Sequence, residues 1–218
     1  MRYAVKLPPS LPERLYFCRH GQSLGNARGL NDASLRDLAN HRFPLSDLGL
    51  DQARQLARYV RQEGILADCG EIDVSTFLRA EQTLEIIRDE HPCDLPVHQD
   101  ARLDEWWQGI YHSMTAQERE RHYPGEDAIL AREGWHHYRP PQGESGKDVE
   151  LRLLSFLQDL RGIPFISGHG RSGAILDRLL CDRELDRDCA YPNMKNCELW
   201  QFTKIGTRYR RETLFLPS

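Results

Sequence analysis

An apolar run that ends abruptly in polar and small residues constrains this chain more than any other feature. Leu15 to Cys18 is followed at once by Arg19, His20 and Gly21. Such a run predicts a buried strand whose carboxyl end presents an arginine beside an imidazole. In α/β folds, ligands bind in the crevice outside the carboxyl ends of the strands. Because arginine can give forked hydrogen bonds to phosphate, the pair favours a phosphorylated ligand.

Two later segments repeat this layout. Ser75 to Thr83 reads STFLRAEQT and Ser167 to Gly170 reads SGHG, so a short apolar or β-branched stretch precedes a lone arginine or histidine. Between them, LDEWWQG (Leu103 to Gly109) supplies a carboxylate, Glu105. Phosphoryl transfer needs a nucleophile, cations for the phosphate oxygens and a proton for the leaving oxygen. Two arginines, two histidines and one glutamate meet those needs.

These motifs resemble those of the histidine phosphatase superfamily, the phosphoglycerate mutase-like proteins, over nearly the whole chain. RHGQSLGN (Arg19 to Asn26) matches the family pattern R-H-G-x-S/T-x-x-N, and FLRAEQT (Phe77 to Thr83) matches its second arginine motif. LDEWWQG matches L-x-E-x-x-x-G, and His169 with Gly170 matches the second H-G. The middle of the chain is most similar to a plant, fungal and bacterial branch known mainly as phosphatases.

The resemblance implies a role for each motif residue. His20 is expected to be the nucleophile that becomes phosphohistidine, and Glu105 the general acid. Arg19, Arg79 and His169 complete the expected catalytic set by stabilising the charge on the phosphate. With that much fixed positive charge, no metal ion and no cofactor is expected. The expected phosphate-binding residues are Arg19, Ser23, Asn26, Arg79, His169 and Gly170.

The activity implied by the resemblance is metal-independent hydrolysis of phosphomonoesters by a histidine acid-type phosphatase. Two alternatives stay open, namely a cofactor-dependent phosphoglycerate-type mutase and a non-catalytic phosphate-binding protein on the same fold. EWWQG lacks the basic and aromatic pattern that follows the acid in such mutases, and Gly25 replaces their tryptophan before Asn26. Both differences favour the phosphatase.

Several residues outside the motifs have open roles. Arg171 stands where many relatives carry glycine, so its side chain could reach the phosphate, an acidic substrate or solvent. We interpret the other histidines as structural or surface residues, with His41 as a possible substrate contact. They are His41, His91, His98, His112, His122, His136 and His137.

The order of predicted elements indicates an α/β protein, a three-layer α/β/α sandwich with a mostly parallel sheet, phosphoglycerate mutase-like. The predicted strands are 15–18, 72–77, 97–99 and 164–167, with two edge strands at 198–203 and 208–216. Helices are predicted from Ser46 to Gly64, over 79–90, after Thr115, over 127–137, after Ser145 and over 173–181. Thr115 and Glu118 form a predicted capping box.

A chain of 218 residues without a linker rich in Pro, Gly or Ser is expected to form one domain, residues 1–218. An insertion at about 110–146 is expected to cover the site and set specificity, with Trp106, Trp107, Trp135 and Tyr138 either lining a pocket or packing.

A net charge of −4 excludes a broad nucleic-acid-binding face. No apolar run approaches the roughly 20 residues of a membrane span. We expect a cytoplasmic protein that acts on small phosphorylated substrates; its oligomeric state stays open.

Overall fold

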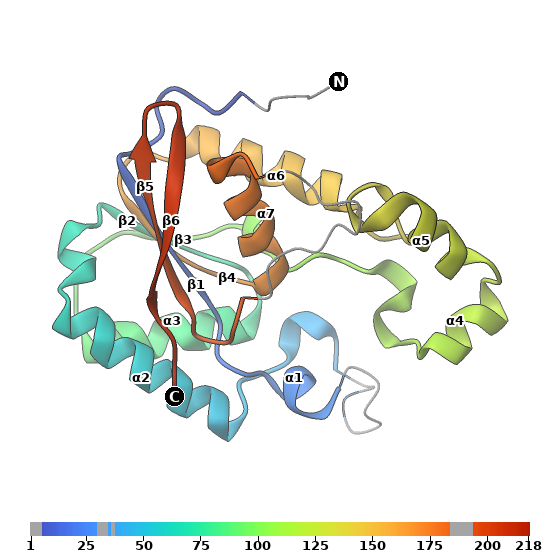
Figure 1. Ribbon diagram of the computed structural model, residues 1–218. Coiled ribbons are helices and arrows are strands. Elements are labelled where there is room, and N and C mark those ends of the chain that lie inside the picture. Colours follow the sequence, from blue (N-terminus) through green and yellow to red (C-terminus); the bar gives the residue numbers. More distant parts are fainter. Residues whose placement is uncertain (1–5, 30–34, 36–37, 184–193) are drawn as a thin grey trace.

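The computed structural model describes residues 6–29, 35, 38–183 and 194–218. A central sheet carries helices on both faces (Figure 1), which confirms the predicted α/β architecture. The six strands lie in the order β3-β2-β4-β1-β5-β6. Their bounds are β1 Arg14–Arg19, β2 Glu71–Val74, β3 Val97–Gln99, β4 Pro164–Gly168, β5 Leu199–Ile205 and β6 Arg208–Phe215.

The sheet is parallel except at its carboxyl-terminal side. Strand β1 pairs in parallel with β4, β4 with β2, and β2 with β3, whereas β5 and β6 are antiparallel. The expectation of two edge strands is wrong for β5, because β5 pairs with β1 on one side and β6 on the other. Its first residues, Leu199 and Trp200, are buried accordingly.

Two apolar cores lie on opposite faces of the sheet. Helices α2 (Asp47–Gln62) and α3 (Leu78–Glu90) cover one face, and α6 (Gly146–Asp159) and α7 (Gly170–Cys181) cover the other. The side chains of β1 alternate between the two cores, with Phe17 facing α6 and α7 and Cys18 facing α2 and α3. Strand β1 is therefore buried on both faces, as its apolar run predicts.

The predicted helix caps at Ser46 and Thr115 are present. Ser46 Oγ accepts from the Gly49 N–H at 3.1 Å at the start of α2, and Thr115 Oγ1 accepts from the Glu118 N–H at 3.1 Å at the start of α4. The other helices of the described residues are α1 Leu24–Arg28, η2 Asn40–Arg42, η3 Ile65–Asp68, η4 Ala101–Leu103, η5 Gly109–Ser113, α4 Ala116–His122 and α5 Glu126–His137. Helices α4 and α5 extend beyond the sheet, at the right of Figure 1.

Helix α7 begins three residues earlier than the sequence predicts. It starts at Gly170 directly after His169, and the Gly173 N–H donates to the His169 carbonyl at 2.9 Å. In a sequence pattern, a glycine inside a helical segment indicates a possible break in the helix. A Cβ atom at Gly173 would lie only 2.6 Å from the Phe17 ring. Close packing of α7 on β1 therefore explains a glycine inside this helix.

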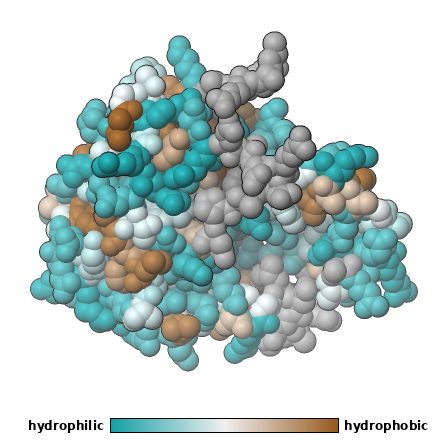
Figure 2. All heavy atoms as spheres, in the orientation of Figure 1, coloured by the Kyte–Doolittle hydropathy of each residue, from teal (hydrophilic) through white to brown (hydrophobic). Residues whose placement is uncertain are grey.

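The surface is predominantly polar. On the face in Figure 2, hydrophobic residues form small separate patches among hydrophilic ones. Within the described ranges, no helix combines the length and the apolar character required to cross a membrane.

Candidate active site

The register of β1 against β4 brings His20 beside His169. Arg19 pairs with Gly168 in the parallel ladder, so the next residue of each strand lies at the same level of the sheet edge. The backbone N–H of His20 donates to the Gly168 carbonyl at 3.0 Å, and the centroids of the two imidazole rings lie 5.0 Å apart. The two histidines, 149 positions apart in the chain, thus form one cluster at the carboxyl ends of the strands.

Both ring nitrogens of His20 are engaged. Its Nδ1 lies 2.6 Å from the Gly21 carbonyl oxygen, and its Nε2 lies 3.0 Å from Nε of Arg79. Because a carbonyl only accepts and a guanidinium only donates, Nδ1 carries the hydrogen and Nε2 carries the lone pair. Burial lowers the pKa of His20 well below its usual value, and Arg79 and Arg19 lower it further. The imidazole is therefore neutral, with a lone pair on Nε2.

Arg79 is buried in a fixed orientation. Its Nη1 donates to the Asn40 carbonyl at 2.8 Å and faces Asn40 Oδ1 at 3.3 Å, while its guanidinium lies 4.8 Å from the centroid of Phe77. Burial lowers the pKa of Arg79 to about 10, so the group stays charged at neutral pH. The Asn40 contact was not predicted from the sequence.

Arg19 leaves part of its guanidinium available. Its Nη1 donates to the Met194 carbonyl at 2.5 Å, whereas its Nε is buried and has no hydrogen-bond partner in the described structure. A Cβ atom at Gly170 would lie 3.3 Å from that Nε, so glycine gives the arginine room at the start of α7. A buried donor without a partner is costly unless a ligand satisfies it.

His169 is held by a chain of hydrogen bonds. Its Nε2 lies 2.7 Å from Ser75 Oγ, and that hydroxyl donates to Asp104 Oδ1 at 2.7 Å. Since the hydroxyl has one hydrogen, Nε2 of His169 must be the donor toward Ser75. Its Nδ1 is buried without a partner in the described structure. Burial lowers the pKa of His169 well below its usual value, with Arg79 next in effect.

The half-buried Glu105 carboxylate is oriented by the backbone around it. Its Oε1 accepts from the Trp106 N–H at 2.9 Å. Arg152 on α6 supports the same segment, with Nη1 donating to the Arg102 carbonyl at 2.6 Å and Nη2 to the Asp104 carbonyl at 2.8 Å. Its Nε donates to Glu144 Oε1 at 2.8 Å. Arg152 therefore fixes the backbone that presents Glu105.

One cavity of about 140 Å³ unites most of the predicted site residues. Its lining comprises Arg19, His20, Ser23, Asn26, Asn40, Arg79, Glu105, Trp106, Gln108, His112 and Arg171. His169 and Gly170 lie outside this lining: His169 is fully buried against His20, and Gly170 lies against Arg19. Ser23 and Asn26 form the capping box of α1, where Ser23 Oγ accepts from the Asn26 N–H at 3.1 Å.

His112 is a cavity residue that sequence reasoning missed. It stacks on Trp107 with ring centroids 5.6 Å apart, and its Nε2 is buried without a partner in the described structure. Burial lowers the pKa of His112, as does Arg79. His41, by contrast, is exposed and contacts Phe77 at the edge of the site. The only sequence signal for His112 is its position three residues after the LDEWWQG motif.

The aromatic residues near the insertion divide between lining and packing. Trp106 lines the cavity, and its ring meets Trp135 edge to face with centroids 4.8 Å apart. Trp107 is 42% exposed. Tyr138 is buried and donates to Glu126 Oε2 at 2.7 Å. The expectation of pocket lining is thus confirmed for Trp106, whereas Trp135 and Tyr138 line a separate cavity of about 80 Å³.

Residues 15–176 match the family model of the histidine phosphatase superfamily (branch 1). The chain belongs to this family. Bovine 6-phosphofructo-2-kinase/fructose-2,6-bisphosphatase 1 is 32% identical over 149 residues, which are 68% of this chain and 28% of that protein. The probable phosphoglycerate mutase GpmB of Yersinia pestis is 29% identical over 182 residues, covering 77% of this chain and 74% of the mutase.

Solved structures of similar fold confirm the phosphoglycerate mutase-like architecture. A mycobacterial glucosyl-3-phosphoglycerate phosphatase in complex with VO3 has a TM-score of 0.71 and 24% identity, covering 92% of this chain and 98% of that one. YhfR of Bacillus stearothermophilus has a TM-score of 0.71 and 25% identity, covering 92% and 96%. A phosphohistidine mechanism is typical of the histidine phosphatase superfamily, which contains phosphatases and mutase-like proteins.

Proposed function

We propose that this protein hydrolyses phosphate monoesters of small molecules through a phosphohistidine on Nε2 of His20, without a metal ion or cofactor. The observation that carries the proposal is that a single cavity is lined by His20, Glu105 and the two motif arginines, Arg19 and Arg79. A neutral imidazole with a lone pair on Nε2 suits a nucleophile, because it brings no negative charge toward the phosphate.

The first step transfers the phosphoryl group to the enzyme. The Nε2 lone pair of His20 attacks phosphorus, and the bond from phosphorus to the ester oxygen breaks. Glu105, protonated, gives its hydrogen to that oxygen, so the product alcohol leaves neutral. For this to occur, Arg79 turns its Nε–H from His20 to a phosphate oxygen. Arg19 offers its unpartnered Nε–H to another oxygen.

The second step regenerates the enzyme. The Glu105 carboxylate takes a proton from water, and the water oxygen attacks phosphorus. The bond between phosphorus and Nε2 of His20 breaks, its electron pair returns to Nε2, and inorganic phosphate leaves. Charge on the equatorial oxygens is stabilised in both steps by the guanidinium groups of Arg19 and Arg79.

Four further residues are proposed to contact the phosphate. His169 presents its unpartnered Nδ1 from beside His20; once protonated against the bound dianion, that nitrogen donates to an oxygen. Gly170 contributes its backbone N–H at the start of α7, where the helix dipole favours an anion. Ser23 and Asn26 supply a hydroxyl and an amide at the start of α1.

We further propose that residues 1–218 act as one domain in which the insertion at about 110–146 sets specificity. Its support is that His112 of η5 lines the cavity and that Trp135 of α5 packs on Trp106, another lining residue. The reacting groups lie outside the insertion: His20 follows β1, Arg79 lies at the start of α3, and Glu105 lies in the loop between η4 and η5. The insertion is therefore free to vary with the substrate.

Hydrolysis and mutase activity share the phosphohistidine step and differ in the acceptor. The Yersinia relative is named a probable phosphoglycerate mutase. A mutase returns the phosphoryl group to a phosphoglycerate, whereas the proposed phosphatase gives it to water. A phosphate ester with a labelled phosphoryl group, incubated with excess phosphoglycerate, separates the two activities. The proposed phosphatase releases the label as inorganic phosphate, whereas a mutase transfers it to the phosphoglycerate.

The test is hydrolysis of 4-nitrophenyl phosphate in the presence of EDTA by wild type, His20→Ala and His98→Ala. His98 is an exposed residue of β3 and serves as the matched control. We expect wild type and His98→Ala to be active and His20→Ala to be inactive. Equal activity of His20→Ala and wild type would refute the assignment of the nucleophile, and loss of activity with EDTA would refute the metal-free mechanism.

A further inference from the structure

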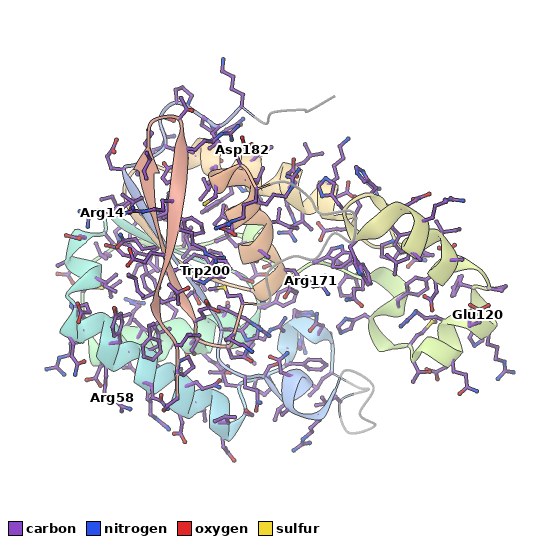
Figure 3. All side chains as sticks on the ribbon, viewed as in Figure 1. Arg14, Arg58, Glu120, Arg171, Asp182 and Trp200 are labelled. Atoms are coloured by element: carbon purple, nitrogen blue, oxygen red, sulfur yellow. The ribbon has the colours of Figure 1, made fainter. Side chains whose placement is uncertain are left out.

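Arg171 occupies a position at the site that the proposed phosphoryl transfer does not use. It is the second residue of α7 and lines the same cavity as His20 and Glu105. Its guanidinium lies 5.2 Å from the ring centroid of Trp106 and 5.4 Å from that of Trp135. Figure 3 shows Arg171 between the start of α7 and the insertion. Two indole rings thus hold this cation without consuming its N–H groups.

Arg171 also lacks a counter-charge. Among the described residues it makes no hydrogen bond and no ion pair. Other arginines at similar depth are paired: Arg152 contacts Glu144 at 2.8 Å, and Arg178 contacts Glu150. A guanidinium that is held in place, lines a cavity and keeps its donors free is arranged to bind an anion from solution.

The charges around the cavity indicate that this anion is additional to the reacting phosphate. The lining contains three guanidinium groups, of Arg19, Arg79 and Arg171, and one carboxylate. In the free protein His20 and His112 are neutral, and His169 gains a proton only against the bound phosphate, so no histidine adds negative charge. Asp104 lies outside the lining, bound by Ser75 and Thr76. A phosphate monoester dianion balances two of the three cations. When Glu105 is protonated to act as the acid, the third cation remains unbalanced.

We propose that Arg171 is a specificity residue that binds a second anionic group, carboxylate or phosphate, on the substrate of this enzyme. This inference rests on the proposed function and deepens it, because it defines the substrate class as small phosphate monoesters with a second negative charge. The reacting phosphate lies at His20, Arg19 and Arg79, and the second anion lies toward Trp106 and Trp135. Phosphate monoesters that have no second anionic group leave Arg171 unpaired and are poorer substrates.

The test compares substrates of equal shape and different charge. The first pair is 2-carboxyethyl phosphate and its amide, 2-carbamoylethyl phosphate; propane-1,3-diyl bisphosphate supplies a second phosphate in place of the carboxylate. Each is assayed with wild type, Arg171→Gln, Arg171→Lys and Arg58→Gln. Arg58 is an exposed arginine of α2 and controls for loss of one positive charge (Figure 3).

We expect wild type to prefer an anionic ester over the amide by about tenfold or more in kcat/KM, chiefly through KM. Arg171→Gln abolishes that preference while changing turnover of the amide by less than about threefold, and Arg171→Lys retains part of it. Arg58→Gln behaves as wild type. Whichever of the carboxylate and bisphosphate esters carries the larger preference identifies the second anion.

Two results would overturn the inference. One is equal kcat/KM of wild type for the amide and both anionic esters; the other is an equal loss on all three in Arg171→Gln, which a merely structural arginine would produce. Calorimetric binding of 4-phosphonobutanoate and 4-phosphonobutanamide measures the same contrast without turnover. An enzyme that binds the acid more tightly yet hydrolyses no ester would contradict the proposed function and support the inference. Equal binding would contradict the inference.

Discussion

The Nε–H of Arg79 donates a hydrogen bond of 3.0 Å to Nε2 of His20. With Nδ1 directed at the Gly21 carbonyl, the imidazole is held at both nitrogens, and only Nε2 has a lone pair. A phosphoryl group reaches that lone pair when Arg79 turns its Nε–H away from His20 and donates that hydrogen bond to a phosphate oxygen. The same guanidinium thus orients the nucleophile before binding and stabilises the phosphate afterwards.

This double task predicts that lysine cannot replace arginine at position 79. Lysine keeps the charge but lacks the rigid set of N–H groups that contacts His20 and Asn40 together. We expect Arg79→Lys to lower kcat/KM for phosphate esters by about 100-fold or more. Arg88→Lys, at an exposed position of the same helix, is the control. An Arg79→Lys enzyme with at least half of wild-type kcat/KM would contradict this role.

The assignment of Glu105 as general acid predicts a dependence on the leaving group. An alkoxide needs a proton to leave, whereas 4-nitrophenolate leaves without one. Glu105→Gln is therefore expected to slow hydrolysis of alkyl phosphates by about 10²- to 10⁴-fold, and to slow formation of the phosphoenzyme from 4-nitrophenyl phosphate much less. Rapid-quench kinetics measure both, with Glu120→Gln on α4 as control. Equal losses on the two substrates would argue against proton donation by this residue.

The buried neutral histidines predict how stability depends on pH. Burial lowers the pKa of His20 and His169 well below the usual value of 6.5, so both stay neutral in the folded state at pH values at which the unfolded chain protonates them. In the unfolded chain both are protonated below about pH 6.5. The unfolded state then binds more protons than the folded state. As the pH is lowered, the free energy of unfolding therefore falls by up to about 1.4 kcal/mol per pH unit for each histidine.

Urea denaturation of wild type and His20→Gln at several pH values measures this contribution. Between pH 6 and 5, the slope of unfolding free energy against pH should be smaller in the variant by about 1.4 kcal/mol per pH unit. Between pH 7.5 and 8.5 the histidine is neutral in both states, so the two slopes should agree there. Parallel curves over the whole range would show that His20 has the same pKa in the folded and unfolded states, which would contradict the lowered pKa.

Arg152 is predicted to act through the backbone that carries Glu105. Removing its donors from the Arg102 and Asp104 carbonyls frees that segment while leaving the phosphate contacts in place. We expect Arg152→Gln to lower kcat for an alkyl phosphate by about tenfold, with KM changed by less than about twofold. Partial recovery in Arg152→Lys and unchanged activity in Arg54→Gln, an exposed arginine, complete the comparison. A rise in KM with constant kcat would contradict a positioning role.

Strand β1 and the position of His20 at its carboxyl end could be predicted from the sequence because both depend on a local pattern of residues. The apolar run ending at Cys18 marks a buried strand. Parallel strands align their carboxyl ends, which explains why His20 and His169 meet. The helix caps at Ser46 and Thr115 depend on residues three apart, and both are present.

Contacts between residues far apart in the sequence could not be predicted in this way, because no local pattern indicates them. Asn40 of η2, His112 of η5 and Arg152 of α6 contact the site, but the local sequence pattern of these helices does not predict those contacts. The start of α7 was missed because Gly173 looks like a helix breaker until Phe17 is seen packed against it. For Arg171 the sequence left several roles open, and the choice depends on the two indole rings that hold its guanidinium.

The most direct test of the account is the identity of the phosphorylated atom. Wild type and Glu105→Gln, mixed with 4-nitrophenyl phosphate and quenched in base, are digested and mapped by mass spectrometry and phosphorus NMR. We predict an acid-labile phosphoryl group on Nε2 of His20, present at higher occupancy in Glu105→Gln because its hydrolysis lacks a base. A phosphoryl group on His169, on Nδ1 of His20 or on any serine, or turnover without a covalent intermediate, would contradict the account.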